Sequence, residues 1–480
     1  MEAITGIGPM KTPNILMIMT DQQRADSMGY AGNKPSDTPN LDRLARQGAI
    51  FENAYSSSTS CVPARSSLMT GLLPHRVPTV DSNGRKSAGL GLSLKPGQWT
   101  IARALRDAGY ETALFGKMHF HPMHADHGFD VMHMCEHLPA GYAENAEDDY
   151  RKWLTSTGRE DTRFVRASTP RPFPYEAEYH PTNWIKRHSL DFLGNRDSSV
   201  PYFAIISFTA PHTPYDPPEP YASMYRPEEQ EIPAKGIEVN AGLPAPLLDA
   251  VMAEGNRRSL TPRRVKEHTE LHVREVLAAI RASINCIDAA IGEVMEKVDL
   301  NNTIVFFLSD HGDYGGHRGL LGKTPWIPFD DLIHVPFFAV GAGVTPGRRI
   351  REPVQSFDYV ATALEYAALE PPVADMESAS LLPLLKGAAP DNDRPVFSGT
   401  LEGWPMIRRG RFKDIWHSGY DVHALFDLES DPDESVNLAE DPAYASLIAE
   451  NTKILKAILA KQPVSEPDNG AAAFRKASGR

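Results

Sequence analysis

The chain has 480 residues, of which 41% are hydrophobic and 23% charged, as in an ordinary folded, water-soluble protein. Its net charge of −13 argues against sequence-independent binding to nucleic acid or to an anionic membrane. The apolar run at 15–19 is too short for a signal sequence or a membrane span, and three cysteines are too few for a disulfide framework. We therefore predict a cytoplasmic globular protein.

Unbroken apolar runs mark the strands of a buried sheet. The runs at 14–20, 201–208 and 303–309 lack alternating polar residues, which is typical of strands covered on both faces. Helix signals lie between them, so the pattern predicts an α/β fold with a large, mostly parallel sheet between helices.

The helix signals have their own punctuation. The first predicted helix spans 38–48, where Thr38 can cap the start, Pro39 suits the first turn and Gly48 suits the exit. The stretch 100–109 repeats this pattern. The longest helix is predicted over 264–298, where aliphatic side chains recur at steps of three and four residues.

Changes in composition divide the chain into a large domain, a small subdomain and a tail. The boundary is placed at the Pro-Pro pair after Glu370, and two stretches rich in proline, aromatic or charged residues are interpreted as insertions. We predict a catalytic domain over 1–370 with insertions at about 139–180 and 214–262, a C-terminal α+β subdomain over 371–461 with short strands and a closing helix, and a flexible tail over 462–480.

Two of the predicted strands end in acidic residues. Asp21 follows the first strand and is followed by Gln22, while Asp310 and His311 follow the strand at 303–309. Ligands gather at the carboxyl ends of strands in open α/β sheets, and oxygen ligands suit Ca²⁺ or Mg²⁺ better than zinc. Taken alone, each aspartate is better explained as a cap of the turn that follows its strand, and only a third element makes the pair informative.

A third element is the run Cys61-Val-Pro-Ala-Arg-Ser-Ser-Leu-Met-Thr-Gly71. Pro63 favours the first turn of a helix, so Cys61 is predicted at a helix N-terminus, where the dipole favours negative charge. Arg65 would lie on the same face, one turn later, and is expected to reach back toward residue 61. The residues alone leave two interpretations, a low-pKa thiol nucleophile or a small buried apolar residue.

The whole run resembles the C-x-P-x-R-x-x-x-x-T-G signature of type I sulfatases, in which the cysteine is converted to formylglycine (3-oxoalanine). Further stretches resemble other blocks of that family, namely 14–22, 38–45, 116–119, 210–212, 309–312 and 426–438. The resemblance covers most of the chain. It implies an alkaline-phosphatase-like fold and maturation by a formylglycine-generating enzyme.

The resemblance also implies the roles of individual residues. One Ca²⁺ (or Mg²⁺ or Mn²⁺) per chain would be held by Asp21, Gln22, Asp310, His311 and the modified residue 61. Arg65 would stabilise the hydrated aldehyde, and His119 would act near the formylglycine diol. The sulfate oxygens would be bound by Lys117 and Lys323, and His212 would protonate or hold the leaving-group oxygen.

The implied function is hydrolysis of a sulfate monoester of a small molecule or carbohydrate. The Asp21-Gln22 pair, in place of Asp-Asp, resembles choline-sulfatases and phosphonate monoester hydrolases, so a phosphonate monoesterase or phosphodiesterase is the alternative. The Gly-Lys-x-His block ending at His119 favours sulfate, because the phosphonate branch usually lacks it. A non-catalytic metal-binding protein with unmodified Cys61 is the second alternative.

Aromatic residues in and beside the insertions are expected to shape the leaving-group pocket, namely Tyr142, Tyr175, Tyr179, Trp184, Tyr215 and Tyr221. Aromatic walls suit sugars, aryl groups or a quaternary ammonium equally well. The Pro-rich insertions and the tail are also candidate subunit contacts, which leaves a homo-oligomer open.

Overall fold

The computed structural model describes residues 12–32, 38–77, 79–81, 92–95, 97–136, 148–162, 169–233, 240, 242–254, 270–388, 394–399 and 403–464. Residues 264–269 of the predicted long helix, 465–480 of the predicted tail, Tyr142 and parts of both predicted insertions lie outside these ranges.

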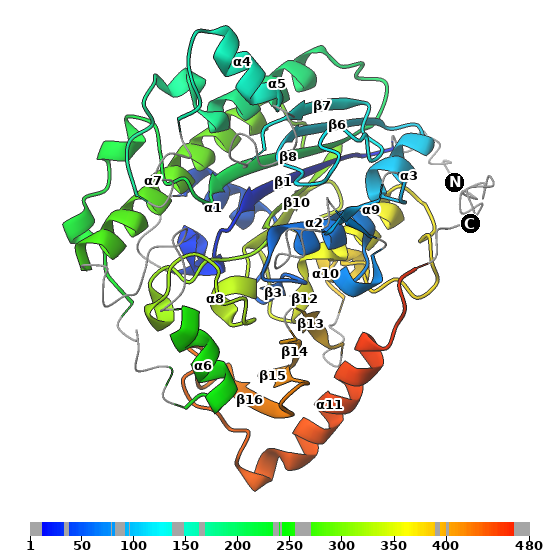
Figure 1. The fold of residues 1–480 in the computed structure, drawn as a ribbon. Coiled ribbons are helices and arrows are strands. Elements are labelled where there is room, and N and C mark those ends of the chain that lie inside the picture. Colours follow the sequence, from blue (N-terminus) through cyan, green and yellow to red (C-terminus); the bar gives the residue numbers. More distant parts are fainter. Residues whose placement is uncertain are drawn as a thin grey trace, which may run out of the picture.

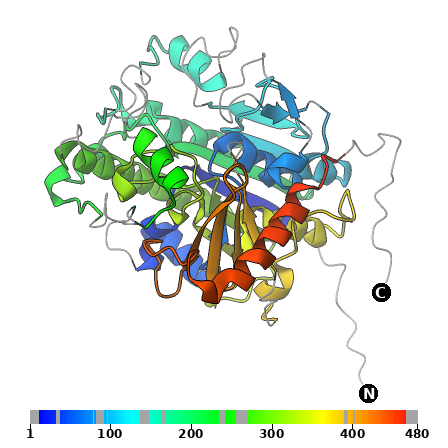
Figure 2. The same ribbon diagram turned by 60° about the horizontal axis from the view of Figure 1, so that its bottom comes forward.

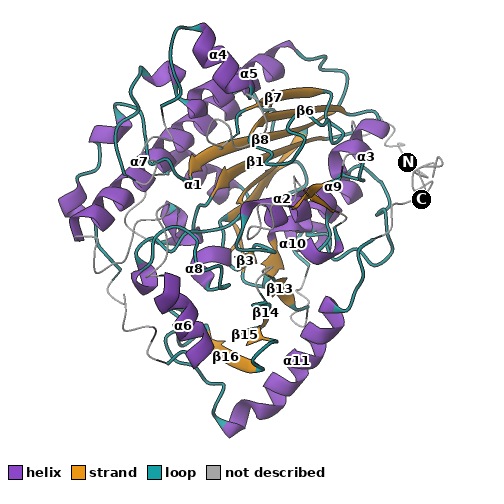
Figure 3. Ribbon diagram, viewed as in Figure 1, coloured by secondary structure: helices purple, strands orange, loops and turns teal. Residues whose placement is uncertain are grey.

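An eight-stranded sheet forms the centre of the molecule (Figures 1 and 3). Its order is β11-β2-β10-β9-β1-β8-β6-β7, and every pair is parallel except those of β10, which runs antiparallel to β9 and β2. The predicted mostly parallel sheet is therefore confirmed. Its strands are β1 (Asn14–Asp21), β2 (Ala49–Phe51), β6 (Glu111–Gly116), β7 (Val131–Met134), β8 (Tyr202–Pro211), β9 (Thr303–Ser309), β10 (Phe337–Gly341) and β11 (Arg348–Ile350).

Helices cover both faces of this sheet, which is why its central strands β1, β8 and β9 are buried and mainly apolar (Figure 1). Alternate side chains of β1 enter two separate clusters, with Met17 on one face and Leu16 on the other. The Met17 cluster includes residues of α2 (Cys61–Thr70), α3 (Ile101–Asp107) and α9 (Tyr359–Tyr366). The Leu16 cluster includes residues of α1 (Pro39–Gln47), α5 (Pro181–Asn195) and α7 (Glu270–Met295).

The predicted helix starts agree with the structure in position, but one cap differs. Thr100 accepts a 3.1 Å hydrogen bond from the Arg103 N–H and caps α3 as expected. Thr38 occupies the N-cap position of α1 without accepting a bond from that helix, because its hydroxyl accepts from the Gly29 N–H and donates to Asp42. The fixed φ of Pro39 at the first position still sets the start of α1.

A four-stranded antiparallel sheet follows in the C-terminal part, with α11 (Ala445–Leu459) lying along it (Figure 2). Its strands are β13 (Val396–Ser398), β14 (Met406–Arg409), β15 (Phe412–His417) and β16 (Val422–Asp427). The predicted short strands and closing helix are thus confirmed, while the boundary at 370 stays a prediction. The remaining elements are β3 (Ala54–Tyr55), β4 (Thr79–Asp81), β5 (Leu92–Leu94), β12 (Val354–Gln355), α4 (Asp149–Ser156), α6 (Ala245–Glu254), α8 (Asp330–Ile333) and α10 (Leu382–Leu385).

The small sheet is tied to the main domain by apolar and ionic contacts. Phe329 and Leu332 pack in one cluster with side chains from the small sheet, including Ile415. Beside them, the fully buried Lys413 pairs with Asp330 and Glu434, both at 2.6 Å. A buried cation without partners would be costly, so these two carboxylates fix where β15 meets α8.

Candidate active site

The carboxyl ends of β1 and β9 meet at the centre of the sheet. The parallel register pairs Thr20 with Ser309, so the next residues, Asp21 and Asp310, lie side by side. Asp21, Asp310 and His311 are all completely buried. The predicted convergence of the two acidic strand ends is therefore observed.

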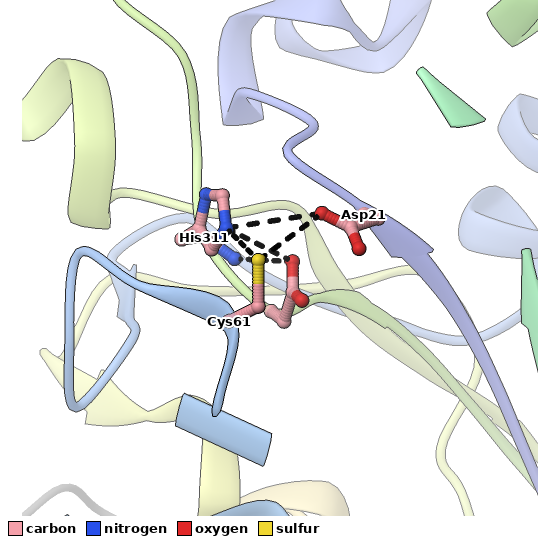
Figure 4. Close-up of side chains that lie close together, drawn as sticks. Asp21, Cys61 and His311 are labelled. Atoms are coloured by element: carbon pink, nitrogen blue, oxygen red, sulfur yellow. Dashed lines mark hydrogen bonds and ion pairs between the residues drawn. The ribbon is translucent and has the colours of Figure 1, made fainter. Parts of the chain in front are cut away.

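Cys61 reaches the same place from α2, whose first residue it is (Figure 4). Its Sγ lies 3.1 Å from His311 Nε2 and 3.8 Å from Asp21 Oδ1. The whole of α2 is buried, so the start of this helix points into the interior rather than into bulk solvent.

Four of the predicted metal ligands form a compact group. Ligand atoms of Asp21, Cys61, Asp310 and His311 all lie within 4.8 Å of one another, and no other such group of acidic, His or Cys side chains occurs within the described ranges. Two carboxylates and an imidazole are a donor set that a divalent cation accepts, with carboxylates favouring Ca²⁺ or Mg²⁺. The residues present therefore fit a metal ion.

Arg65 and Lys117 neutralise the buried carboxylates of Asp21 and Asp310. Arg65 Nε donates to Asp310 Oδ2 at 2.8 Å, and its Nη2 reaches Asp21 Oδ2 at 3.2 Å. Lys117 Nζ also pairs with Asp21 Oδ2. The expectation that Arg65 turns back to residue 61 has to be refined, because its guanidinium bridges the two aspartates and the Lys117 carbonyl instead.

Nearby positive charges determine the protonation state of the Cys61 thiol. Burial alone would raise the pKa of the thiol, but the charges of Lys117, Lys323 and His311 outweigh it and hold the pKa well below its usual value. Burial also disfavours the charged form of His311, yet the Asp310 carboxylate raises the pKa of this imidazole. The site thus stabilises negative charge at the position of the Cys61 sulfur.

Lys323 and His212 face Cys61 from the solvent side. Lys323 Nζ lies 2.8 Å from Cys61 Sγ, 3.1 Å from His212 Nε2 and 3.3 Å from His311 Nε2. His212 Nδ1 lies 2.9 Å from the Thr213 carbonyl oxygen, which assigns the proton to Nδ1 and leaves Nε2 as the acceptor from Lys323. Both side chains are partly exposed, so an incoming substrate can reach them.

His119 adjoins Cys61 from the loop after β6. Its backbone has a φ of +70°, a conformation uncommon outside glycine, and its side chain is hydrogen-bonded to Cys61. Burial, assisted by the charge of Lys117, lowers the pKa of His119 to about 4. The structure therefore brings together every predicted catalytic residue.

Two buried carboxylates support the site although no sequence signal singled them out. Glu136 Oε1 accepts from the backbone N–H groups of Met118 and His119 at 2.9 and 2.7 Å, which holds the loop that carries His119. Asp313 accepts from the side chain of Gln22. Asp313 follows His311 by two residues and could have been noticed as a further acid, whereas Glu136 lies in no recognisable motif.

The aromatic residues of the predicted pocket divide into core and surface. Trp184 is buried in the core against Tyr150, so the expectation that it lines a pocket is wrong. It is helix α5 that turns this side chain inward, onto the face of the sheet. Tyr175 and Tyr179 are more exposed, and the guanidinium of Arg159 lies over both rings, 3.6 Å from the Tyr179 centroid.

Comparison with known proteins decides the family. The sequence profile of the Sulfatase family matches residues 13–369, and the profile named N-sulphoglucosamine sulphohydrolase, C-terminal, matches residues 325–461. This chain belongs to the sulfatase family. The predicted sulfuric ester hydrolase is thereby confirmed at the level of the family.

Individual relatives match nearly the whole sulfatase chain. It is 32% identical to an arylsulfatase of Clostridium perfringens, covering 92% of this chain and 93% of the relative. It is 31% identical to a choline-sulfatase of Rhizobium meliloti, covering 90% and 83%. The predicted resemblance to sulfatases, including the choline-sulfatase branch, is therefore confirmed.

Solved structures confirm the predicted alkaline-phosphatase-like fold. The phosphonate monoester hydrolase SpPMH of Silicibacter pomeroyi superposes with a TM-score of 0.76 at 25% identity, covering 93% of this sulfatase and 94% of that chain. The phosphonate monoester hydrolase of Agrobacterium radiobacter gives 0.75 at 24%, covering 93% and 95%. Within the described part of the sulfatase, no helix has the length and apolar character needed to cross a membrane.

Proposed function

We propose that this sulfatase hydrolyses a sulfate monoester of a small molecule or carbohydrate after Cys61 has been converted to formylglycine. The observation that carries the proposal is the convergence of Lys323, His311 and Asp21 on the Cys61 sulfur, at the start of a buried helix. A nucleophile formed at this position would meet both a cation site and positive side chains. In its hydrated form, formylglycine supplies a hydroxyl nucleophile and a second hydroxyl whose collapse releases sulfate.

One divalent cation would be held by Asp21, Gln22, Asp310 and His311 together with residue 61. Four of these residues already have their ligand atoms within 4.8 Å of one another. Such an ion supplies electrostatic stabilisation of the charge on the sulfate oxygens. Arg65 and Lys117 offset the negative charge of the two aspartates, so the site does not depend on the cation alone.

The remaining residues are assigned by where they stand around Cys61. Lys323 is partly exposed and next to the sulfur, and it would bind a sulfate oxygen as a point charge. His212 and Lys323, 3.1 Å apart, would together hold the departing oxygen and supply its proton. His119, which is mostly neutral at pH 7 because its pKa is about 4, would accept a hydrogen bond from the nucleophile.

A side-by-side turnover measurement tests the function. The sulfatase is co-expressed with a formylglycine-generating enzyme and assayed with an aryl sulfate and an aryl phosphonate monoester, with Cys61→Ala as the blank. We expect the sulfate ester to turn over faster, and the rate to vanish in the variant. Faster phosphonate turnover would replace the proposal with the alternative.

That alternative is favoured by one observation. Phosphonate monoester hydrolases superpose with TM-scores of 0.75 and 0.76, although the curated relatives at 31–32% identity are sulfatases. The Gly-Lys-x-His block at 116–119 supports sulfate, because it resembles sulfatases and the phosphonate branch usually lacks it.

A non-catalytic metal-binding protein is the remaining alternative. Mass spectrometry of the peptide that contains residue 61 distinguishes it, because conversion to formylglycine replaces the cysteine sulfur with oxygen. We expect the converted mass after co-expression with the generating enzyme. A peptide that keeps its sulfur under these conditions would support the non-catalytic alternative.

A further inference from the structure

The carboxylate of Asp313 contacts two segments of the active site, the one that carries Gln22 and the one that carries Lys323, rather than the sulfur atom of Cys61. Asp313 is almost completely buried and lies in the segment after β9, three positions beyond Asp310 and two beyond His311. Its Oδ2 accepts from Gln22 Nε2, while its Oδ1 accepts from the N–H groups of Gly315 at 2.6 Å and Gly322 at 3.1 Å. The two oxygens of one carboxylate thus serve two different segments.

The first segment carries Gln22, next to Asp21. The Gln22 backbone has a φ of +67°, and its N–H donates to Asp310 Oδ1 at 3.1 Å, so the residue is held against both strand ends. An amide has one donor end and one acceptor end. With Nε2 given to the Asp313 carboxylate, the atom that can serve a cation is the oxygen Oε1.

The second segment is the loop that carries Lys323. Gly322 precedes Lys323, and its N–H and C=O bind Asp313 Oδ1 and the Tyr314 N–H, the latter at 2.7 Å. On the other side of Lys323, the Pro325 carbonyl accepts from the Tyr314 hydroxyl at 2.7 Å. The lysine is therefore fixed between two anchor points that both lead back to residues 313 and 314.

We propose that Asp313 is a positioning residue that orients the Gln22 amide with its oxygen toward the cation and holds the Lys323 loop over Cys61. This inference rests on the proposed function, since it concerns the cation and the sulfate-binding lysine of that same site. It explains how a neutral Gln22 can replace a carboxylate as ligand, because a neighbouring acid selects which end of the amide faces the ion.

Asp313→Asn separates the two tasks of Asp313. The new amide can keep its oxygen on Gly315 and Gly322, which leaves its NH₂ group facing Gln22 Nε2, a donor against a donor. Gln22 must then turn its oxygen to residue 313 and present NH₂ to the cation. We expect Ca²⁺ binding, measured by calorimetry on chelator-treated protein, to weaken by about 10- to 100-fold.

A double variant that combines Gln22→Glu with Asp313→Asn restores a matched pair. Here the amide introduced at position 313 donates to one oxygen of the carboxylate introduced at position 22, and the other oxygen is again available to the cation. We expect the double variant to recover most of the Ca²⁺ affinity that Asp313→Asn loses. Asp358→Asn serves as the control, because Asp358 is equally buried but pairs with Arg394 away from the site.

Asp313→Ala removes both carboxylate oxygens and tests whether Asp313 holds the Lys323 loop in place. We expect it to lose Ca²⁺ affinity as Asp313→Asn does and, in addition, to raise the KM for an aryl sulfate at saturating Ca²⁺, because Lys323 is no longer held in place. At saturating Ca²⁺, the KM of Asp313→Asn for the aryl sulfate should stay close to that of wild type.

The inference is overturned if Asp313→Asn binds Ca²⁺ as tightly as wild type, or if the double variant binds no better than Asp313→Asn. If neither Asp313→Asn nor Asp313→Ala folds, as judged by circular dichroism, Asp313 acts in stability alone and the inference is overturned too. If wild type itself binds no divalent cation and cleaves no sulfate ester, the proposed function fails instead. The two failures are thus distinguishable.

Discussion

The Nζ atom of Lys323 lies 2.8 Å from the Sγ atom of Cys61, although 262 residues separate them in the chain. On its far side the same ammonium group contacts His212, and His311 contacts the sulfur directly. Cys61 is therefore adjoined on one side by two partly exposed groups, the ammonium group of Lys323 and the imidazole of His212. An anionic ester approaching from that side would meet the lysine and the histidine before the nucleophile.

Cys61→Ala and Cys61→Ser should each lose nearly all sulfate ester turnover while folding normally. Neither side chain can give the aldehyde in a system that converts cysteine, and both are small enough for the buried start of α2. Aryl sulfate hydrolysis and circular dichroism of the purified variants check this. Turnover of Cys61→Ala within about tenfold of wild type would contradict the assignment, since loss of a nucleophile costs far more.

Asp310→Asn should lower both the bound Ca²⁺ and the rate. The substitution keeps the shape of the side chain but removes its charge from the cation and from Arg65, which donates to Oδ2 at 2.8 Å. Elemental analysis of protein loaded with Ca²⁺ measures the first effect, and aryl sulfate turnover the second. If the metal content of the variant equals that of wild type, Asp310 is no ligand.

Lys117→Ala and Lys323→Ala should differ in stability although both impair activity. The side chain of Lys117 has no exposed surface, and its removal takes a cationic partner from the buried Asp21, which we expect to cost about 3 kcal/mol of unfolding free energy. Lys323 is partly exposed, so its loss should change stability by less than about 1 kcal/mol. Urea unfolding of the two variants makes the comparison, and equal destabilisation would contradict it.

The sequence indicated the parts of the site that depend on local pattern. Apolar runs placed β1 and β9, and their ends placed Asp21 and Asp310, because parallel strands end at one edge of a sheet. The run beginning at Cys61 carried its own helix signal in Pro63.

The contacts that tune the site could not be predicted, because they join segments that only the fold brings together. Asp313 meets Gln22 across 291 residues, and Arg65 meets Asp310 across 245. Trp184 was misjudged because an aromatic residue near an insertion has the same local pattern whether it faces a pocket or the core. Roles assigned to Lys117, His119, His212 and Lys323 came from the family resemblance rather than from their spacing.

His127 should make folding sensitive to acid. Its ring packs edge-on against Phe120 with centroids 5.3 Å apart, and neither nitrogen has a hydrogen-bond partner among the described residues. Burial lowers its pKa from 6.5 to about 4, so the unfolded chain takes up a proton between these values that the folded chain refuses. The stability contributed by neutral His127 is therefore fully present above pH 6.5 and falls as the pH drops toward 4.

Between pH 7 and 5, wild type should lose about 1–2 kcal/mol more of its unfolding free energy than His127→Asn, in which asparagine tolerates the φ of +44°. Urea unfolding at both pH values measures the difference, and because every other histidine is common to both proteins, an equal loss would show that His127 is not the group responsible.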